Sequence, residues 1–150
     1  MKLEIIERNP LKLKQNCNSE NYRELLNLYE DFYKKIGFTL PWVGYFIINE
    51  NKIVGSCGFV GPPEKGRVEI SYWTFKEYEG QGIAGFACSQ LIKIAHSKDE
   101  NLNITAKTAP QNNASTTILQ KNGFEFSGIV QDEGIGDAWL WINRHFKKDK

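Results

Sequence analysis

A glycine-rich turn in the middle of the chain is the strongest constraint on how it folds. Gly80, Gly82 and Gly85 stand between an alternating apolar and polar segment, residues 67–75, and a segment with helical spacing, residues 83–97. Glycine adopts left-handed backbone conformations and lets a ligand approach the peptide nitrogens. The first N–H groups of a helix have no partner within it and carry partial positive charge. The turn therefore predicts either a plain strand-to-helix junction or an anion site, most naturally for a pyrophosphate.

Hydrophobic periodicity predicts a single α/β domain over residues 1–150. Strands are expected at residues 3–8, 43–48, 53–60, 67–75, 102–108, 124–130 and 137–143, with a hairpin turn at 49–52. Helices are expected at residues 21–36, 83–97 and 112–122, the first with Ser19 as a candidate cap. This order of elements implies a mixed sheet with helices on its faces.

Charge and cysteine content exclude several other classes of protein. The net charge of +1 gives no electrostatic footprint for nucleic acid. Cys17, Cys57 and Cys88 lack metal-ligand or redox spacing, which favours buried thiols in a reducing compartment. No apolar run has membrane-spanning length, and the opening residues do not match a signal peptide. We therefore expect a cytoplasmic protein that binds no nucleic acid, membrane or metal. The protein is expected to be a monomer or a homodimer.

The same turn also matches G-x-G-x-x-G, the fingerprint of dinucleotide-binding proteins. Such a site needs an acidic residue about 20 residues further on, at the end of the next parallel strand, to hold the ribose. The next predicted strand runs into Lys107-Thr108-Ala109-Pro110, while Asp99 and Glu100 precede it. This context disfavours a dinucleotide-dependent oxidoreductase, which remains the weakest alternative.

Three motifs resemble the GNAT superfamily of N-acetyltransferases. The segment Glu79-Gly80-Gln81-Gly82-Ile83-Ala84 is similar to the R/Q-x-x-G-x-G/A motif, whose loop cradles the pyrophosphate of coenzyme A. Residues 67–73 resemble the strand before that loop. Residues 112–115 and 119–124 are similar to the N-x-x-S…L-x-K-x-G-F signature of the ribosomal-protein N-terminal acetyltransferase branch, the RimJ/RimL type. The similarity extends over about residues 41–142.

The resemblance implies an α-β-α sandwich around a mostly antiparallel seven-stranded sheet that is splayed where the coenzyme inserts. It implies that acetyl-CoA is the cosubstrate and that a small-molecule amine or a protein N-terminus attacks it directly in a ternary complex. A backbone N–H near residues 72–74 is expected to polarise the thioester oxygen. The coenzyme-binding residues implied in this way are Tyr72, Trp73, Thr74, Glu79, Gly80, Gln81, Gly82, Ile83, Ala84, Gly85, Asn112 and Ser115.

Two positions depart from the family pattern. Glu79 stands where the family has Arg or Gln, and a carboxylate beside a pyrophosphate is unfavourable unless it points away or pairs, for example with Lys76. Leu119 stands where many members have a tyrosine that assists the departing thiolate. These departures leave open a non-catalytic module that only binds acyl-CoA.

Glu69 is the candidate general base, acting directly or through water. Strand alternation places Glu69 on the same face as Arg67 and Trp73, so a surface ion pair with Arg67 is the alternative. Ser115 stands where the branch has a serine thought to protonate the leaving thiolate, and its alternative role is a helix cap. An α-amino group, with a pKa of about 8, needs only a modest base.

The acceptor is expected to lie against the first helix, the loop at residues 38–42 and the last strands. Neither His96 nor His145 falls within a motif, and we assign them no catalytic role. Aromatic residues that could line the acceptor side, and that core packing explains equally well, are Tyr33, Phe38, Trp42, Trp139 and Trp141.

Overall fold

The structure is a computed structural model, which describes residues 1–8 and 20–144 of the 150-residue chain. The predictions made for Cys17, Ser19 and His145 lie outside these described residues. In the part of the chain that is described, no helix is long and apolar enough to cross a membrane.

Seven strands form one sheet in the order β1-β2-β3-β4-β5-β7-β6. Neighbouring strands are antiparallel except β4 and β5, which run parallel. The expected mixed, mostly antiparallel seven-stranded sheet is therefore confirmed. The strands are β1 (Lys2–Ile5), β2 (Gly44–Asn49), β3 (Lys52–Phe59), β4 (Arg67–Thr74), β5 (Asn103–Thr108), β6 (Glu125–Asp132) and β7 (Gly136–Asn143).

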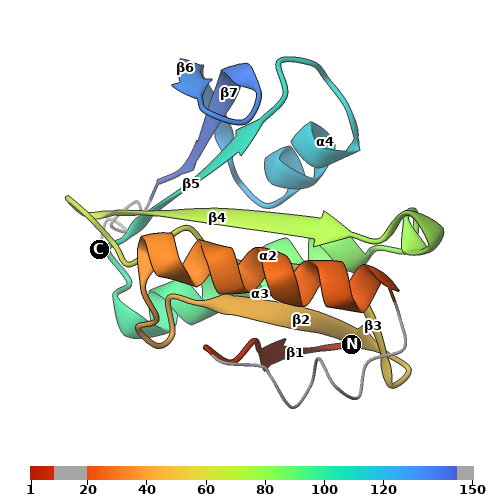
Figure 1. Ribbon diagram of the computed structural model, residues 1–150. Helices are drawn as coiled ribbons and strands as arrows, with labels where there is room; N and C mark the ends of the chain where they lie inside the picture. Colours follow the sequence, from red (N-terminus) through yellow and green to blue (C-terminus); the bar gives the residue numbers. More distant parts are fainter. Residues whose placement is uncertain (9–19, 145–150) are drawn as a thin grey trace.

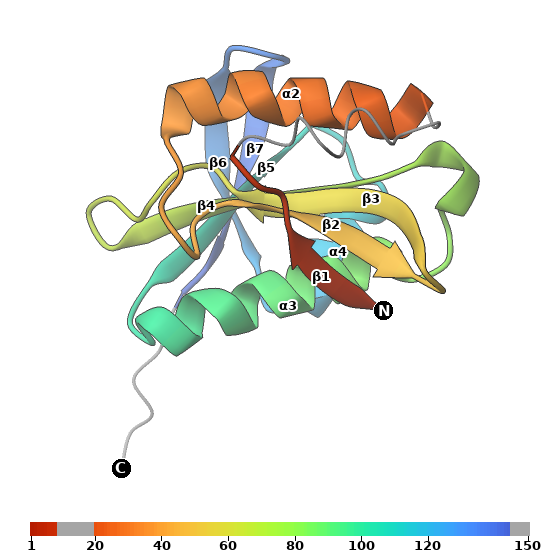
Figure 2. The same cartoon turned by 60° about the horizontal axis from the view of Figure 1, so that its bottom comes forward.

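Helices cover both faces of the sheet. Helix α2 (Glu20–Ile36) lies on one face and α3 (Ile83–Lys98) on the other, where it packs on β3 and β4 (Figures 1 and 2). The short helix α4 (Ala114–Lys121) contacts α3, and a single 3₁₀ turn, η1 (Lys76–Tyr78), precedes α3. All three predicted helices are present, which gives the expected α-β-α sandwich.

Capping and backbone conformation explain the start of helix α4, which differs from the sequence prediction, and the hairpin between β2 and β3, which agrees with it. Helix α4 begins at Ala114, later than expected, because Asn113 is its cap: the Asn113 side chain accepts a hydrogen bond from the Thr116 backbone N–H at 3.2 Å. The predicted hairpin between β2 and β3 is present. Its two central residues, Glu50 and Asn51, have φ angles of 51° and 64°, as a tight two-residue turn requires.

The sheet opens between β4 and β5. Their parallel register runs from Arg67–Asn103 to Ile70–Ala106 and ends there. Strand β4 nevertheless continues along β3 as far as Thr74. Beyond Ile70 the two strands diverge, as Figure 1 shows, and an opening forms at their carboxyl ends.

A buried tyrosine joins α2 to the sheet. The Tyr33 hydroxyl donates a hydrogen bond to the Ile6 carbonyl at 2.7 Å and accepts one from the Gly44 N–H at 2.9 Å. The residue is only 5% exposed. One side chain therefore hydrogen-bonds a carbonyl group directly after β1 and an N–H group at the start of β2, while its ring packs in the core.

We expect Tyr33→Phe to lower the free energy of unfolding by about 1–3 kcal/mol, because it leaves a buried N–H and a buried carbonyl without their partner. The matched control is Tyr45→Phe, which removes one hydrogen bond to the Pro41 carbonyl and should cost about half as much or less. Urea unfolding followed by circular dichroism measures both. Equal losses in the two variants would contradict this role of Tyr33.

Candidate active site

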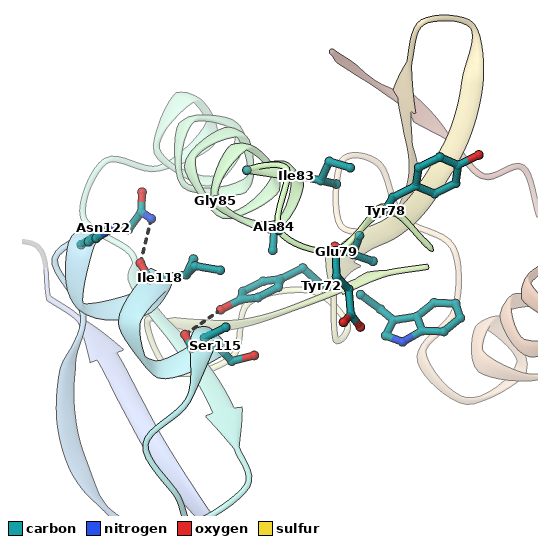
Figure 3. A pocket seen from close by; sticks show the side chains of 15 residues that line it. Tyr72, Tyr78, Glu79, Ile83, Ala84, Gly85, Ser115, Ile118 and Asn122 are labelled. Atoms are coloured by element: carbon teal, nitrogen blue, oxygen red, sulfur yellow. Dashed lines mark hydrogen bonds between the residues drawn. The ribbon is translucent and has the colours of Figure 1, made fainter. Parts of the chain in front are cut away.

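A cavity of about 450 Å³ lies where β4 and β5 diverge, bounded by the turn before α3 and by α4 (Figure 3). Three separate segments of the chain form its wall. The lining residues are Tyr72, Trp73, Thr74, Tyr78, Glu79, Gly80, Gly82, Ile83, Ala84, Gly85, Ala114, Ser115, Ile118, Lys121 and Asn122.

The turn before α3 presents uncapped backbone N–H groups to this cavity. Gly80 and Gly82 have φ angles of 81° and 78°, in the left-handed region that glycine tolerates best. Gly82 is the N-cap of α3, so no side chain caps the helix, and the first turn contains no acidic residue. The first intrahelical bond runs from the Phe86 N–H to the Gly82 carbonyl at 3.1 Å. The N–H groups of residues 83–85 are therefore available to an anion.

The exposed edge of β4 forms the second wall. The bonds from Val60 N to the Glu69 carbonyl and from Phe75 N to the Val54 carbonyl show that odd-numbered residues of β4 pair with β3. The backbone groups of even-numbered residues consequently point toward β5. Since the β5 register ends at Ile70, the N–H and carbonyl groups of Tyr72 and Thr74 face the opening. This edge can accept an extended ligand as an additional strand.

Helix α4 closes the third side. The Tyr72 hydroxyl donates a hydrogen bond to the Ser115 carbonyl at 3.3 Å and so links β4 to α4 across the cavity floor (Figure 3). Burial, and to a smaller extent the nearby Cys88, raises the pKa of Tyr72, which keeps the hydroxyl protonated as a donor. Because Asn113 caps the helix, Ser115 is not the cap, and its side chain faces the cavity.

Two expected coenzyme contacts are not part of the cavity wall. Gln81 and Asn112 are exposed and lie outside the lining, whereas the other ten predicted coenzyme-binding residues line it. The sequence analysis missed Tyr78, Ala114, Ile118, Lys121 and Asn122. The residues missed on α4 recur at helical spacing, so the helix period could have identified them once one face was known to meet the cavity.

The cavity carries one charge of each sign at its rim. Among the lining residues in the described part of the chain, Lys121 is positive and Glu79 negative, and both are exposed. The contact between Glu79 and Lys76 is a backbone hydrogen bond, from Glu79 N to the Lys76 carbonyl at 3.3 Å. The anion-binding capacity therefore comes mainly from the backbone of the turn.

Glu69 lies on the opposite face of β4 from Tyr72 and outside the cavity lining. Its carboxylate pairs with Lys107 Nζ at 3.4 Å, rather than with Arg67 as the alternative in the sequence analysis supposed. Burial raises the pKa of the Glu69 carboxyl group above its ordinary value; Lys107 opposes that shift, and Asp132 adds to it. The result is a partly buried carboxyl group whose basicity exceeds that of an ordinary glutamate.

Most aromatic candidates for the acceptor side belong to the core. Tyr33 and Trp141 are buried, the latter with its indole N–H donating to Thr108 Oγ1 at 3.0 Å. Phe38 packs edge-on against Tyr33, and Trp42 packs edge-on against the buried Phe59. By contrast, Trp73 is 52% exposed at the cavity, beside the open strand edge.

The chain is similar to several acetyltransferases over part of its length. A Bacillus licheniformis protein named uncharacterized N-acetyltransferase p20 is 31% identical over 83 residues, covering 55% of this chain and 47% of that protein. The ribosomal-protein-serine acetyltransferase of Escherichia coli is 29% identical over 102 residues, covering 66% and 56% respectively. The chain thus spans about half the length of these two relatives.

Solved structures share the fold over nearly the whole chain. A spermidine N-acetyltransferase SpeG chimera from Vibrio cholerae and hSSAT superposes with a TM-score of 0.71 at 17% identity, covering 97% of this chain and 96% of that one. A RimL ribosomal L7/L12 alpha-N-protein acetyltransferase superposes with a TM-score of 0.66 at 16% identity, covering 95% and 92%. Residues 10–125 match the family described as Acetyltransferase (GNAT) domain, and because this match extends over more than half of the chain, the protein belongs to the GNAT acetyltransferase family.

Proposed function

We propose that this chain is a single catalytic domain that transfers the acetyl group of acetyl-CoA to a primary amine by direct attack in a ternary complex. The observation that carries the proposal is that uncapped helix N–H groups and an unpaired strand edge border one cavity. The first suits a pyrophosphate, and the second suits the amide-containing pantetheine arm of the same molecule.

The coenzyme would be held mainly by backbone groups. The N–H groups of residues 83–85 bind the pyrophosphate, while Tyr72 and Thr74 pair with the pantetheine arm. A backbone N–H on this strand edge also donates to the thioester oxygen and stabilises the negative charge that develops there. Because these donors are fixed in the fold, they need little reorganisation when the reaction occurs.

Glu69 accepts the proton that the acceptor amine must lose, directly or through one water molecule. The amine nitrogen then forms a bond to the acetyl carbon, and the carbon–sulfur bond breaks. Ser115 donates a hydrogen bond to the departing sulfur, as a proton donor or as a coenzyme contact. An unassisted thiolate is also an acceptable leaving group, since a thiol has a pKa of about 8.5.

The acceptor is a small-molecule amine or a protein N-terminus. The named substrates of the relatives support both classes, since one is a spermidine acetyltransferase and another a ribosomal-protein-serine acetyltransferase. A second candidate function, a module that binds acyl-CoA without turnover, is favoured by one observation: Leu119, at the position of the usual tyrosine, is fully buried.

The state of the described cysteines supports the proposal of a cytoplasmic location. Cys57 and Cys88 are free and buried. Burial raises the pKa of both thiols, that of Cys88 to about 12, so neither is a reactive thiolate. Inert, unpaired thiols are typical of a reducing compartment.

The first test is release of free thiol from acetyl-CoA with a panel of polyamines and of peptides that begin with serine or alanine. We expect turnover with at least one class, and a 100- to 1,000-fold lower kcat/KM for Glu69→Gln (about 10²–10⁴ for a general base), with coenzyme A affinity unchanged. Binding of coenzyme A by calorimetry without any turnover would favour the binding module instead.

The second test adds a side-chain cap to α3. Asn tolerates the positive φ of Gly82 and its side chain can bond the N–H groups of the first helical turn, where the phosphate would bind. We expect Gly82→Asn to preserve the free energy of unfolding within about 0.5 kcal/mol but to weaken coenzyme A binding roughly tenfold. Gly66→Asn is the matched control, because Gly66 has a φ of 76° and open space around its Cβ position. Equal affinities in the two variants would rule out the helix terminus as the phosphate site.

The third test concerns the unfavourable charge at the rim. Replacing Glu79 by Gln should strengthen coenzyme A binding by about two- to fivefold at low salt, and the gain should shrink as ionic strength rises. Glu100→Gln is the control, because Glu100 lies beyond the far end of the 16-residue helix α3, about 24 Å from its start. Isothermal titration calorimetry at two salt concentrations measures both. An unchanged or weaker affinity in the Glu79 variant would mean that the carboxylate points away from the phosphates.

A further inference from the structure

Glu69 belongs to an ion-pair network of three charged side chains that come from three strands. Lys107 on β5 lies between two carboxylates, with its Nζ 3.4 Å from Glu69 Oε1 on β4 and 3.7 Å from Asp132 Oδ1 at the end of β6. The three side chains are each about 30% exposed. Partial burial makes such charges interact more strongly than on an open surface.

The β6–β7 turn fixes Asp132, which is the far end of this network. Asp132 Oδ2 accepts hydrogen bonds from the backbone N–H groups of Gly134 at 3.0 Å and Ile135 at 3.3 Å. With one oxygen held by the turn, the other remains directed at Lys107. The arrangement ties the turn to Glu69 through a single lysine.

We propose that Lys107 is a positioning residue that holds the Glu69 carboxyl group ionised and oriented for proton transfer, and that Asp132 sets the strength of this effect. The inference rests on the proposed function, in which Glu69 is the base. It adds two residues that the sequence motifs do not include.

Lys107 and Asp132 act on Glu69 with opposite signs. Burial favours the neutral carboxyl group, the positive charge of Lys107 favours the carboxylate, and the negative charge of Asp132 disfavours it. These are the charged groups on other strands that act on Glu69 in the described structure, Lys107 on the neighbouring β5 and Asp132 at the end of β6. Removing the positive charge should therefore confine the basic form to higher pH, and removing the negative charge should extend it to lower pH.

The same ion-pair network also suits a cationic acceptor. Two carboxylates and one ammonium group leave a formal charge of −1 beside the open end of β4, which attracts an incoming ammonium ion. When that ion approaches Glu69, Lys107 retains a partner in Asp132. Neutralising Asp132 should thus raise the KM for the amine more than it changes kcat.

The decisive experiment is an NMR titration of the Glu69 side-chain carboxyl carbon, which needs no turnover. We expect the midpoint to move to higher pH in Lys107→Met, to lower pH in Asp132→Asn, and to stay near the wild-type value in Lys107→Arg. The control Arg144→Met breaks the remote ion pair between Arg144 and Glu125 and should leave the midpoint unchanged.

Kinetics then link the titration to catalysis. At pH 6, kcat/KM of Lys107→Met should fall about tenfold, because less Glu69 is ionised, and it should return to within about twofold of wild type at pH 9. Unchanged Glu69 midpoints in both charge-removing variants, or an equal loss at pH 6 and pH 9, would overturn the inference. An inactive wild-type protein with shifted midpoints would instead refute the proposed function and leave the charge coupling standing.

Discussion

Strand β4 is hydrogen-bonded to β3 from Glu69 to its end at Thr74 but to β5 only as far as Ile70, and this mismatch creates the cavity. Continuous pairing would fill the space with a backbone ladder. The divergence instead leaves backbone N–H and carbonyl groups on the side of β4 that faces away from β3. Beyond the end of the register, β5 no longer supplies hydrogen-bond partners for these groups. The turn into α3 follows directly at the same end of β4, so two kinds of unpaired backbone donor converge. The site is thus a consequence of sheet topology before it depends on any particular side chain.

A site made largely of backbone donors explains why the unusual charge at Glu79 need not abolish coenzyme binding. The peptide N–H groups at the start of α3 are present whatever residue stands at the rim, and Gly82 leaves them without a competing cap. Exposed rim charges are screened by solvent and salt, so their effect on affinity is modest. Side chains matter more on the other face of β4, where burial makes the ionisation of Glu69 depend on its neighbours.

Local patterns in the sequence predicted every strand and helix, because periodicity, glycines and caps act over a few residues. They also predicted the glycine turn, whereas the open strand edge was expected only from the resemblance to the GNAT superfamily. They did not predict that Lys107 pairs with Glu69, because this contact depends on the register of two parallel strands that are distant in sequence. Asn112 lies outside the cavity lining, next to Asn113, which caps α4, and its role at the coenzyme stays a prediction.

The two faces of β4 carry different parts of the proposed active site. Tyr72, Thr74 and the open edge line the cavity, whereas Glu69 lies outside its lining and pairs with Lys107 on the other face. In the proposed mechanism, the donor and the acceptor would therefore approach the end of the strand from different sides, and attack would occur where the pairing with β5 stops. If Asp132 and Lys107 act on Glu69 as we propose, changes to the β6–β7 turn would alter the choice of amine while the backbone donors of the coenzyme site remain unchanged. In the proposed mechanism, acceptor specificity would depend on these side chains, and coenzyme binding would depend mainly on the backbone of the fold.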